Sequence, residues 1–331
     1  MRHTFFCIDA HACGNPVRLV AGGGPMLPHV SMAERRDLFV RDHDWVRRAL
    51  MFEPRGHDVM SGAILYPSVR SDCDVGVLFI EVSGCLPMCG AGTIGLVTIA
   101  IEEGLVRPRT PGRLSLETPA GRVDVRYVQN GAKVESVQFF NVASFLSHSD
   151  VVMDVPGLGE LTVDVSFGGN YYAIVEPQAA WRGLSGVSGG ELVAHSRALL
   201  GALAPLLEVV HPEQPQIQGV HHVLWCDQGS EKSDGRSAVF YGDKAIDRSP
   251  GGTGTSARLA QLHGKGRLAT GARYRAESLI GTVYEGCVES TTTVGPYPAI
   301  VPSVRGWAQV IGHNTIFVDD RDPLAHGFQI V

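Results

Sequence analysis

Met88-Cys89-Gly90-Ala91-Gly92-Thr93 is a glycine-rich stretch that recurs later in the chain as Pro250-Gly251-Gly252-Thr253-Gly254-Thr255. The two copies lie at an offset of 162 residues (251 − 89), and Gly104 after the first copy matches Gly266 after the second at the same offset. This spacing predicts two tight turns, each leading into a helix of similar length. We interpret the chain as an internal duplication in which one copy carries a cysteine and the other a glycine.

Two further pairs of landmarks recur in the same order. Gly14-Asn15-Pro16 is echoed by Gly169-Asn170-Tyr171, and Glu117 with Gly121 is echoed by Glu277 with Gly281. A chain of 331 residues is longer than one ordinary core usually grows. We therefore expect two domains, 1–150 and 151–331, with the last residues crossing back to the first domain.

Strand patterns dominate both halves. Short β-branched or alternating segments predict strands at Phe5–Asp9, Val17–Ala21, Gly62–Leu65, Val75–Glu81, Leu114–Glu117, Val123–Tyr127, Val134–Asn141, Leu161–Phe167 and Tyr171–Val175. Helices are expected at Thr93–Ile101, Glu34–Leu50 and Glu191–Leu207, with a crossover at Asp150–Gly159. The first of these helices is apolar on nearly every face and is predicted to be buried, whereas the five arginines within 34–50 are interpreted as a solvated surface. The fold class is α/β (α+β).

Composition narrows the kind of partner. The net charge is −6, 44% of the residues are hydrophobic, and no stripe of lysine and arginine is present. These features argue against nucleic acid or a membrane as partner and favour a small molecule. The uncharged segment Val82–Ile101 contains a proline and four glycines, so it is interpreted as a strand end, a turn and a buried helix. Seven scattered cysteines and an N-terminus without a signal peptide predict a cytoplasmic protein.

The glycine-rich turns carry the chemistry. The first turn of a helix directs backbone N–H groups outward at the positive end of the helix dipole, where they bind anions such as carboxylates. A cysteine at this place has a stabilised thiolate, so Cys89 is the best candidate for a base. When a thiolate removes the α-proton of a substrate whose carboxylate is held by backbone amides, the substrate becomes an enediolate-like intermediate. This step needs no cofactor or metal. Return of a proton to the opposite face gives inversion, whereas loss of a β-substituent gives elimination.

Several longer segments resemble the proline racemase superfamily, and within it most closely the hydroxyproline 2-epimerases. The segments that carry the resemblance are Ile8-Asp9-Ala10-His11-Ala12-Cys13-Gly14-Asn15-Pro16-Val17-Arg18-Leu19-Val20, Pro54-Arg55-Gly56-His57, Met88-Cys89-Gly90-Ala91-Gly92-Thr93, Gly168-Gly169-Asn170 and Gly242-Asp243-Lys244-Ala245-Ile246-Asp247-Arg248-Ser249-Pro250. The resemblance implies two pseudo-symmetric domains like those of diaminopimelate epimerase, each a sheet or barrel wrapped around a central helix. It also implies a mechanism with two thiols and no cofactor.

The same resemblance implies roles for individual residues. Cys89 is similar to the first catalytic cysteine, Asp247 to the acid that binds the substrate's ring nitrogen, and Gly90, Gly252 and Thr253 to the carboxylate-binding turns. Three positions depart from the family pattern. Gly251 stands where epimerases have the second cysteine and the related dehydratases have threonine, Ala91 where histidine is usual, and Ala12 where threonine is usual.

These departures leave several functions open. The first is epimerisation of 4-hydroxyproline, and the others are one-base dehydration of a 3-hydroxyproline, isomerisation of a bulkier relative, and binding of imino acids without turnover. In each case the expected ligand is a small imino acid with a carboxylate, bound by Cys89, Gly90, Ala91, Asp247, Gly251, Gly252 and Thr253. A homodimer is a possible assembly.

Overall fold

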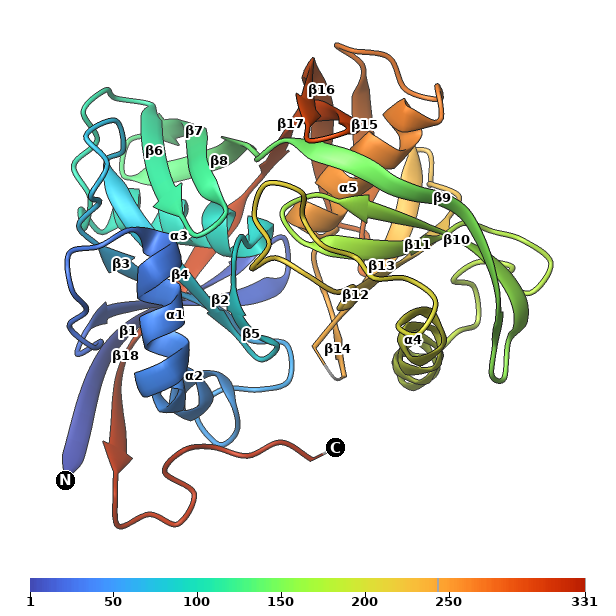
Figure 1. Cartoon of the computed structure of the whole chain (residues 1–331). Coiled ribbons are helices and arrows are strands. Elements are labelled where there is room, and N and C mark those ends of the chain that lie inside the picture. The colour runs from blue at the N-terminus through green and yellow to red at the C-terminus, as the bar shows by residue number, and fades with distance from the viewer. Residues whose placement is uncertain (243, 331) are drawn as a thin grey trace. The chain divides into compact units, whose positions relative to one another are not determined.

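The computed structural model describes residues 1–242 and 244–330 and divides the chain into two compact units. The first unit comprises Met1–Phe139 and Arg305–Val331, and the second comprises Phe140–Val304 (Figure 1). Asp243, which belongs to one of the family-like segments, lies outside the described residues. The expected boundary at residue 150 falls inside a strand of the second unit.

The first unit contains three helices and most of its strands before residue 141. Its helices are α1 (Met32–Asp42), α2 (Asp44–Met51) and α3 (Gly90–Glu102). Its strands are β1 (Arg2–Ala12), β2 (Asn15–Gly22), β3 (Ser61–Tyr66), β4 (Val75–Glu81), β5 (Gly84–Leu86), β6 (Arg113–Thr118), β7 (Gly121–Asn130), β8 (Lys133–Phe140) and, from the end of the chain, β18 (Ala308–Asp319).

The second unit contains two helices, α4 (Gly189–Leu203) and α5 (Gly252–Gly264). Its strands are β9 (Ser144–Val155), β10 (Gly159–Phe167), β11 (Tyr171–Val175), β12 (His222–Asp227), β13 (Gly235–Tyr241), β14 (Ala245–Ile246), β15 (Arg273–Glu277), β16 (Val283–Val294) and β17 (Tyr297–Gly306).

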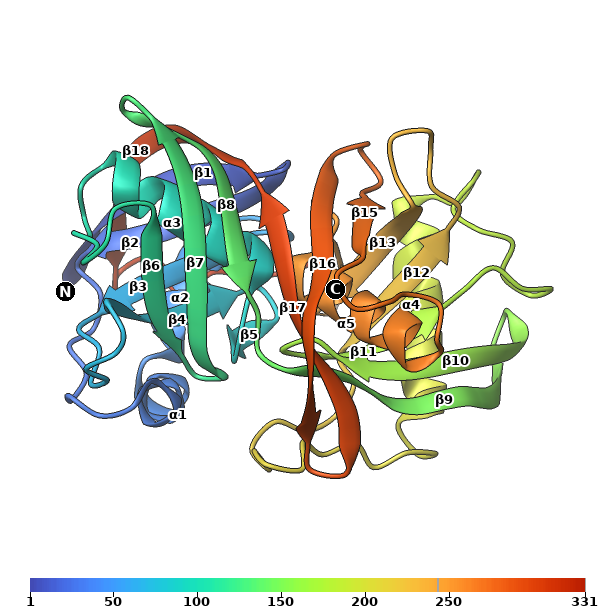
Figure 2. The same ribbon diagram turned by 90° about the horizontal axis from the view of Figure 1, so that it is seen from above.

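In the first unit the strands surround α3. Strand β1 pairs antiparallel with β2 and with β18, so the end of the chain lies beside its beginning. The order continues with β2–β3 parallel, β3–β4 antiparallel, β4–β6 parallel and β6–β7 antiparallel. Helix α3 is buried from Gly90 to Ala100 and packs against β1, β2, β3 and β18 (Figure 2). Its apolar surface on every side is therefore satisfied by burial, as predicted.

The second unit repeats this order of strands around α5. Strand β10 pairs antiparallel with β9 and β11, and β11–β12 parallel, β12–β13 antiparallel, β13–β15 parallel and β15–β16 antiparallel follow. Helix α5 packs against β9, β10, β11 and β16. Helices α3 and α5 both have 13 residues. The predicted fold class, two pseudo-symmetric halves each wrapped around a central helix, is confirmed.

The acidic landmarks of the duplication have the same local role in both units. Glu117 at the end of β6 accepts hydrogen bonds from the hydroxyl of Ser68 and the backbone N–H of Val69. Its counterpart Glu277 at the end of β15 accepts from the hydroxyl of Ser233 and the backbone N–H of Ser230. Each carboxylate thus fastens the loop that precedes the parallel partner of its strand.

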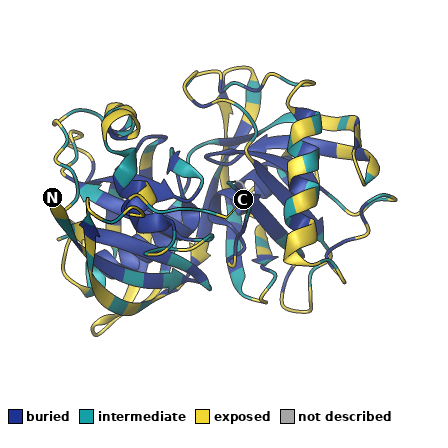
Figure 3. Ribbon diagram, turned by 90° about the horizontal axis from the view of Figure 1, so that it is seen from below, coloured by how far each residue is buried: buried dark blue, intermediate teal, exposed yellow. Residues whose placement is uncertain are grey.

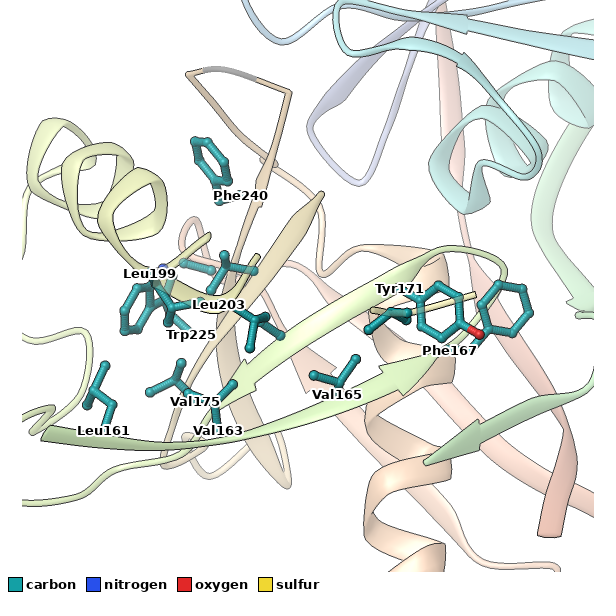
Figure 4. Packing of buried hydrophobic residues seen from close by; sticks show 14 of the residues in the cluster. Leu161, Val163, Val165, Phe167, Tyr171, Val175, Leu199, Leu203, Trp225 and Phe240 are labelled. Carbon is teal, nitrogen blue, oxygen red and sulfur yellow. The ribbon is translucent and has the colours of Figure 1, made fainter. Parts of the chain in front are cut away.

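One large apolar cluster of the second unit lies between its sheet and α4. Figure 4 shows Leu199 and Leu203 of α4 directed toward Trp225, with the side chains of β10 and β11 continuing the cluster. Exposed bands alternate with buried ones along α4 in Figure 3 because only one face of this helix meets the sheet. None of the helices in the described part of the chain is both long enough and apolar enough to span a bilayer.

Three expectations were wrong. The helix predicted over 34–50 is two helices that meet at His43, with the first started by a capping box between Ser31 and Glu34. Two of its arginines are not solvated, since Arg35 is only 1% exposed and donates to backbone carbonyls. Arg47 is likewise buried and donates to the carbonyl oxygen of Glu81. The guanidinium groups of these two arginines donate hydrogen bonds to buried backbone carbonyls. Helical spacing in the sequence does not reveal such bonds.

The third correction concerns the expected crossover at residues 150–159. This segment is regular structure, because β9 continues to Val155 and pairs antiparallel with β10. Only the turn between Val155 and Gly159 interrupts the two strands. Asp150 has a positive φ of 55°, and the pairing of β9 with β10 is irregular near it. Beyond that irregularity exposed and buried residues alternate from Val152 to Val155, as in an ordinary strand.

Candidate active site

Cys89 occupies the N-cap position of α3. Its backbone is extended (φ −135°, ψ 118°), and its Sγ accepts a hydrogen bond from the backbone N–H of Gly92 at 3.1 Å. A side chain at Gly92 would bring its Cβ to 3.0 Å from this sulfur, so the close approach of the N–H depends on glycine. The sulfur therefore lies at the positive end of the helix dipole and receives a donor that favours a thiolate.

The carboxyl group of Glu81 lies against the same sulfur. The Cys89 thiol donates to Oε1 of Glu81 at 2.7 Å, and the hydroxyl of Ser61 donates to the same oxygen at 3.1 Å. The hydroxyl of Ser83 donates to the other oxygen at 3.3 Å. Burial raises the pKa of Glu81, and the three hydrogen bonds oppose that rise. A carboxyl group and a thiol thus share one buried position beside the start of α3.

Residues from three strands complete this arrangement. The amide of Asn15 at the start of β2 donates to the hydroxyl oxygen of Ser61 on β3 at 3.2 Å. Because that hydroxyl accepts from the amide, its own hydrogen is directed to Glu81 at the end of β4. We call Asn15, Ser61, Glu81 and Cys89 the Cys89 network.

Glu81 and Ser61 are site residues that the sequence patterns did not predict. One signal was present, because Glu81 is the single charged residue between Val75 and Ile101. A carboxylate at the end of a fully buried strand is rare unless it has partners. The pairing that supplies Ser61 is a matter of sheet register, with Ser61 opposite Glu81 in the β3–β4 pair.

The neighbouring Cys85 does not share the environment of Cys89. In the described part of the chain none of the seven cysteines forms a disulfide, and burial raises the pKa of Cys85 to about 12. Cys85 is therefore an inert thiol near neutral pH. Across residues 1–242 and 244–330, no three metal-binding side chains converge.

Asp247 and Gly251 belong to the turn that begins α5 in the second unit. The backbone N–H of Asp247 donates to Val239 at 2.8 Å, and its Oδ1 accepts from the N–H of Ser249 at 2.7 Å. The hydroxyl of Ser249 in turn accepts from the N–H of Gly251 at 3.1 Å. These bonds hold a buried carboxylate within the turn.

Gly251 is the N-cap of α5, but its backbone differs from that of Cys89. Its φ is +76°, in the region that favours glycine. A Cβ at this position would lie 2.7 Å from Cγ2 of Val239 and 3.7 Å from Oδ2 of Asp247. The absence of a thiol here is thus accompanied by a backbone conformation and a contact with Val239 that both disfavour a side chain.

The first turn of α5 is anchored by Thr253. Its hydroxyl lies 2.6 Å from the hydroxyl of Tyr172 on β11, and both residues are buried. The Tyr172 ring packs against His222, where burial lowers the pKa of the imidazole to about 3. His222 is therefore neutral near pH 7.

The structure places the residues predicted from sequence in two groups. Cys89, Gly90 and Ala91 lie at the start of α3, and Asp247, Gly251, Gly252 and Thr253 lie in the turn and first helical residues of α5. Ala12 and Ala91, two of the departures from the family pattern, are buried.

A sequence profile of the family described as proline racemase matches residues 7–329. This chain belongs to the proline racemase family. It is 69% identical to "4-hydroxyproline 2-epimerase 2" of Rhizobium rhizogenes over 331 residues, which cover 100% of both chains. It is 56% identical to "4-hydroxyproline 2-epimerase" of Shewanella loihica over 332 residues, again covering 100% of each. The family and the high identity to these epimerases together identify the protein as an isomerase of the racemase and epimerase type.

Solved structures of this family have the same fold. A hydroxyproline epimerase from Agrobacterium vitis with bound trans-4-hydroxy-L-proline superposes with a TM-score of 0.91 at 28% identity, covering 100% of this chain and 97% of that chain. A probable proline racemase from Agrobacterium radiobacter K84 with bound carbonate gives the same TM-score of 0.91 at 31% identity, with coverages of 98% and 96%. A phenazine biosynthesis protein of the PhzF family from Bacillus anthracis shares only the fold, at 13% identity and a TM-score of 0.59.

Proposed function

We propose that this proline racemase family member is a 4-hydroxyproline 2-epimerase that removes the α-proton of its substrate with Cys89. The observation that carries the proposal is the placement of Cys89 at the start of α3, with an amide donor on its sulfur, in a chain 69% identical over its full length to a protein of that name. The neighbour of known structure that holds trans-4-hydroxy-L-proline supports the same substrate class.

The proposed residues have separate tasks. Cys89 takes the α-proton as a thiolate, and the electron pair left on Cα is delocalised into the substrate's carboxylate as an enediolate. The outward N–H groups of Gly90 and Ala91 in α3, and of Gly252 and Thr253 in α5, are suited to an anion because each helix begins at these residues. Asp247 is proposed to bind the positively charged ring nitrogen. This chemistry needs no cofactor.

Epimerisation also needs a proton donor on the opposite face of Cα. Because residue 251 is glycine, this proton must come from a group other than a thiol at that position. The close contact with Val239 and the positive φ, which both disfavour a side chain at position 251, support this part of the proposal. We propose water as the donor on that face. The enzyme is further proposed to act in the cytoplasm, supported by seven cysteines without a disulfide.

The test uses the purified protein in D₂O with trans-4-hydroxy-L-proline, followed by NMR of the α-proton. Epimerisation predicts cis-4-hydroxy-D-proline that carries deuterium at Cα. The 3-hydroxyproline isomers and proline serve as parallel substrates. A pyrroline product from a 3-hydroxyproline would instead identify a dehydratase, and exchange with retained configuration would identify a one-base enzyme without inversion. Binding without exchange would identify an inactive paralogue.

A further inference from the structure

Glu81 carries a buried carboxyl group in contact with Cys89. Proton abstraction by the Cys89 thiolate, as proposed above, assigns no role to this carboxyl group. It is 4% exposed, and its contact with the sulfur is the shortest one that either group makes among the bonds described above. A buried carboxyl normally requires a charged partner or several hydrogen bonds. The partners here are two hydroxyls and a thiol.

The geometry determines where the hydrogens of this group lie. The hydrogen of Ser61 is directed to Oε1 because the hydroxyl oxygen already accepts from Asn15. The Ser83 hydroxyl supplies a hydrogen to Oε2. The remaining hydrogen of the contact between Sγ and Oε1 can be bonded to either atom.

We propose that Glu81 is a positioning residue that shares one proton with Cys89, so that the two side chains act as a single acid-base pair. This inference rests on the proposed role of Cys89 as the base. Transfer of the proton breaks the S–H bond and forms an O–H bond on Glu81, while the negative charge moves from Oε1 to Sγ. The thiolate then takes the substrate's α-proton and forms S–H again, and the electron pair of the Cα–H bond stays on the substrate.

Arg47, a charged side chain near this pair, is not an ion-pair partner of the Glu81 carboxyl group. Arg47 of α2 approaches Glu81, but its Nη1 donates to the backbone carbonyl at 2.9 Å, and its guanidinium is paired with Asp44 at 2.6 Å. Asn15 of β2 and Ser61 of β3 are neutral. From α3 the groups that face the carboxyl are the Cys89 thiol and, on the sulfur, the N–H of Gly92. The single negative charge of the pair is therefore held by hydrogen bonds and the start of the helix.

A pair that shares one proton titrates differently from an isolated thiol. Its first ionisation can remove a proton from either group, so it occurs at lower pH than ionisation of the thiol alone. After that step only a fraction of the molecules carries the charge on sulfur, and the thiolate becomes complete in a second step at higher pH. Glutamine at position 81 leaves only the thiol to ionise.

The experiment compares the wild-type enzyme with Glu81→Gln. We measure the ultraviolet absorbance of the thiolate against pH, and the pH dependence of Cys89 alkylation by iodoacetamide with the modified peptide identified by mass spectrometry. The wild type is expected to form thiolate in two steps, and Glu81→Gln in one. The acidic limb of kcat/KM for trans-4-hydroxy-L-proline should move up by about one pH unit or more in Glu81→Gln.

Two further variants grade the effect. Ser61→Ala removes one donor from Oε1 and should move the acidic limb in the same direction by less than Glu81→Gln does. Glu117→Gln removes another buried carboxyl of the same unit, one bonded to Ser68 and backbone N–H groups, and should leave the limb in place. A purely structural role of Glu81 would lower the rate at every pH without moving the limb.

The proposal is overturned if Glu81→Gln and the wild type share one acidic limb, or if the wild-type thiolate appears in one step of full amplitude. The titration of the wild-type thiolate tests the proposal even if Glu81→Gln does not fold. Both titrations of the thiol need no substrate, so they report on the pair even if the enzyme proves to act on another imino acid.

Discussion

The starts of α3 and α5 are two copies of one structure that have become chemically different. Both open a 13-residue helix inside a surrounding sheet, and both follow a short strand that pairs with the end of its neighbour. In α3 the N-cap is a cysteine with an extended backbone. Its sulfur accepts a hydrogen bond from the N–H of Gly92 in the helix and donates one to Glu81. In α5 the N-cap is a glycine at φ +76° without a side-chain cap.

If the proposed function holds, the difference means that a duplicated scaffold can keep two helix starts suited to an anion while only one of them carries a base. Every residue except proline supplies a backbone N–H group, so the first helical turn keeps its polarity after most substitutions. A base needs a particular side chain with particular neighbours. At α5 the neighbours have closed around the glycine, since Val239 occupies the place into which a side chain would extend.

The largest effect in this comparison is expected from Cys89→Ser. Serine is a good N-cap and keeps the hydrogen bond from Gly92, so the unfolding free energy should change by no more than about 1 kcal/mol. A hydroxyl is a far weaker acid than a thiol, and the rate of α-proton exchange in D₂O should fall by roughly 10²- to 10⁴-fold. Cys287→Ser on β16 is the matched control and should retain the wild-type rate. Undiminished exchange by the Cys89→Ser enzyme would remove the thiol from the mechanism.

Asp247→Asn tests the other turn. Loss of a charged hydrogen bond to the ring nitrogen should reduce kcat/KM for trans-4-hydroxy-L-proline by about 10- to 100-fold, because such bonds contribute about 1.5–3 kcal/mol. Steady-state kinetics measure the loss, and alkylation of Cys89 by iodoacetamide in the absence of substrate serves as the control. That alkylation should keep its wild-type pH dependence. An unchanged kcat/KM would show that the ring nitrogen is bound elsewhere.

Gly251→Cys tests whether the lost thiol can be restored. A cysteine here must adopt a positive φ and displace Val239, so we expect destabilisation of about 1–3 kcal/mol in urea unfolding. The epimerisation rate should not rise. Adding Val239→Ala should relieve the steric part of the loss and leave the backbone part. A stable Gly251→Cys enzyme with faster epimerisation would contradict our account of this turn.

The smallest effects on the reaction rate are expected at Glu117 and Glu277, the corresponding carboxylates of the two units, where a substitution should change mainly the stability. Burial alone would raise the pKa of Glu117, but hydrogen bonds from Ser68 and from backbone N–H groups lower it. Hydrogen bonds from Ser230 and Ser233 lower the pKa of Glu277. Because both folded-state values are lowered, each carboxylate stabilises the fold above the unfolded pKa of about 4.3, and this contribution disappears as the pH falls through the folded value.

Glu117→Gln should therefore cost about 1–3 kcal/mol at pH 7, since it leaves buried N–H donors poorly matched. Glu277→Gln should cost less because Glu277 is more exposed. Urea unfolding at neutral and at acidic pH measures both, and the difference from wild type should shrink in acid. Equal costs at the two positions would indicate that the loops are held by other bonds.

Much of the fold could be predicted from particular residues. The repeated glycine-rich stretches predicted two central helices of similar length, because glycine and a following apolar run mark a helix start independently of tertiary contacts. Their bounds were not predicted to the residue, since α3 spans Gly90–Glu102 where Thr93–Ile101 was expected. Two strands, β4 and β11, have the predicted ends. The break at His43 and the burial of Arg35 could not be predicted, since both depend on what the helices pack against.

The sequence by itself determined the duplication, the family, Cys89 as the single thiol at a helix start, and the glycine that replaces its counterpart. These features are local, because they depend on residue identity and spacing along the chain. Only the tertiary structure decided that Glu81 and Ser61 meet the sulfur and that Val239 closes the place above Gly251. The physical reason is strand register. Pairing of β3 with β4 and of β13 with its neighbours sets which side chains reach each helix start, and no spacing in the sequence encodes that choice.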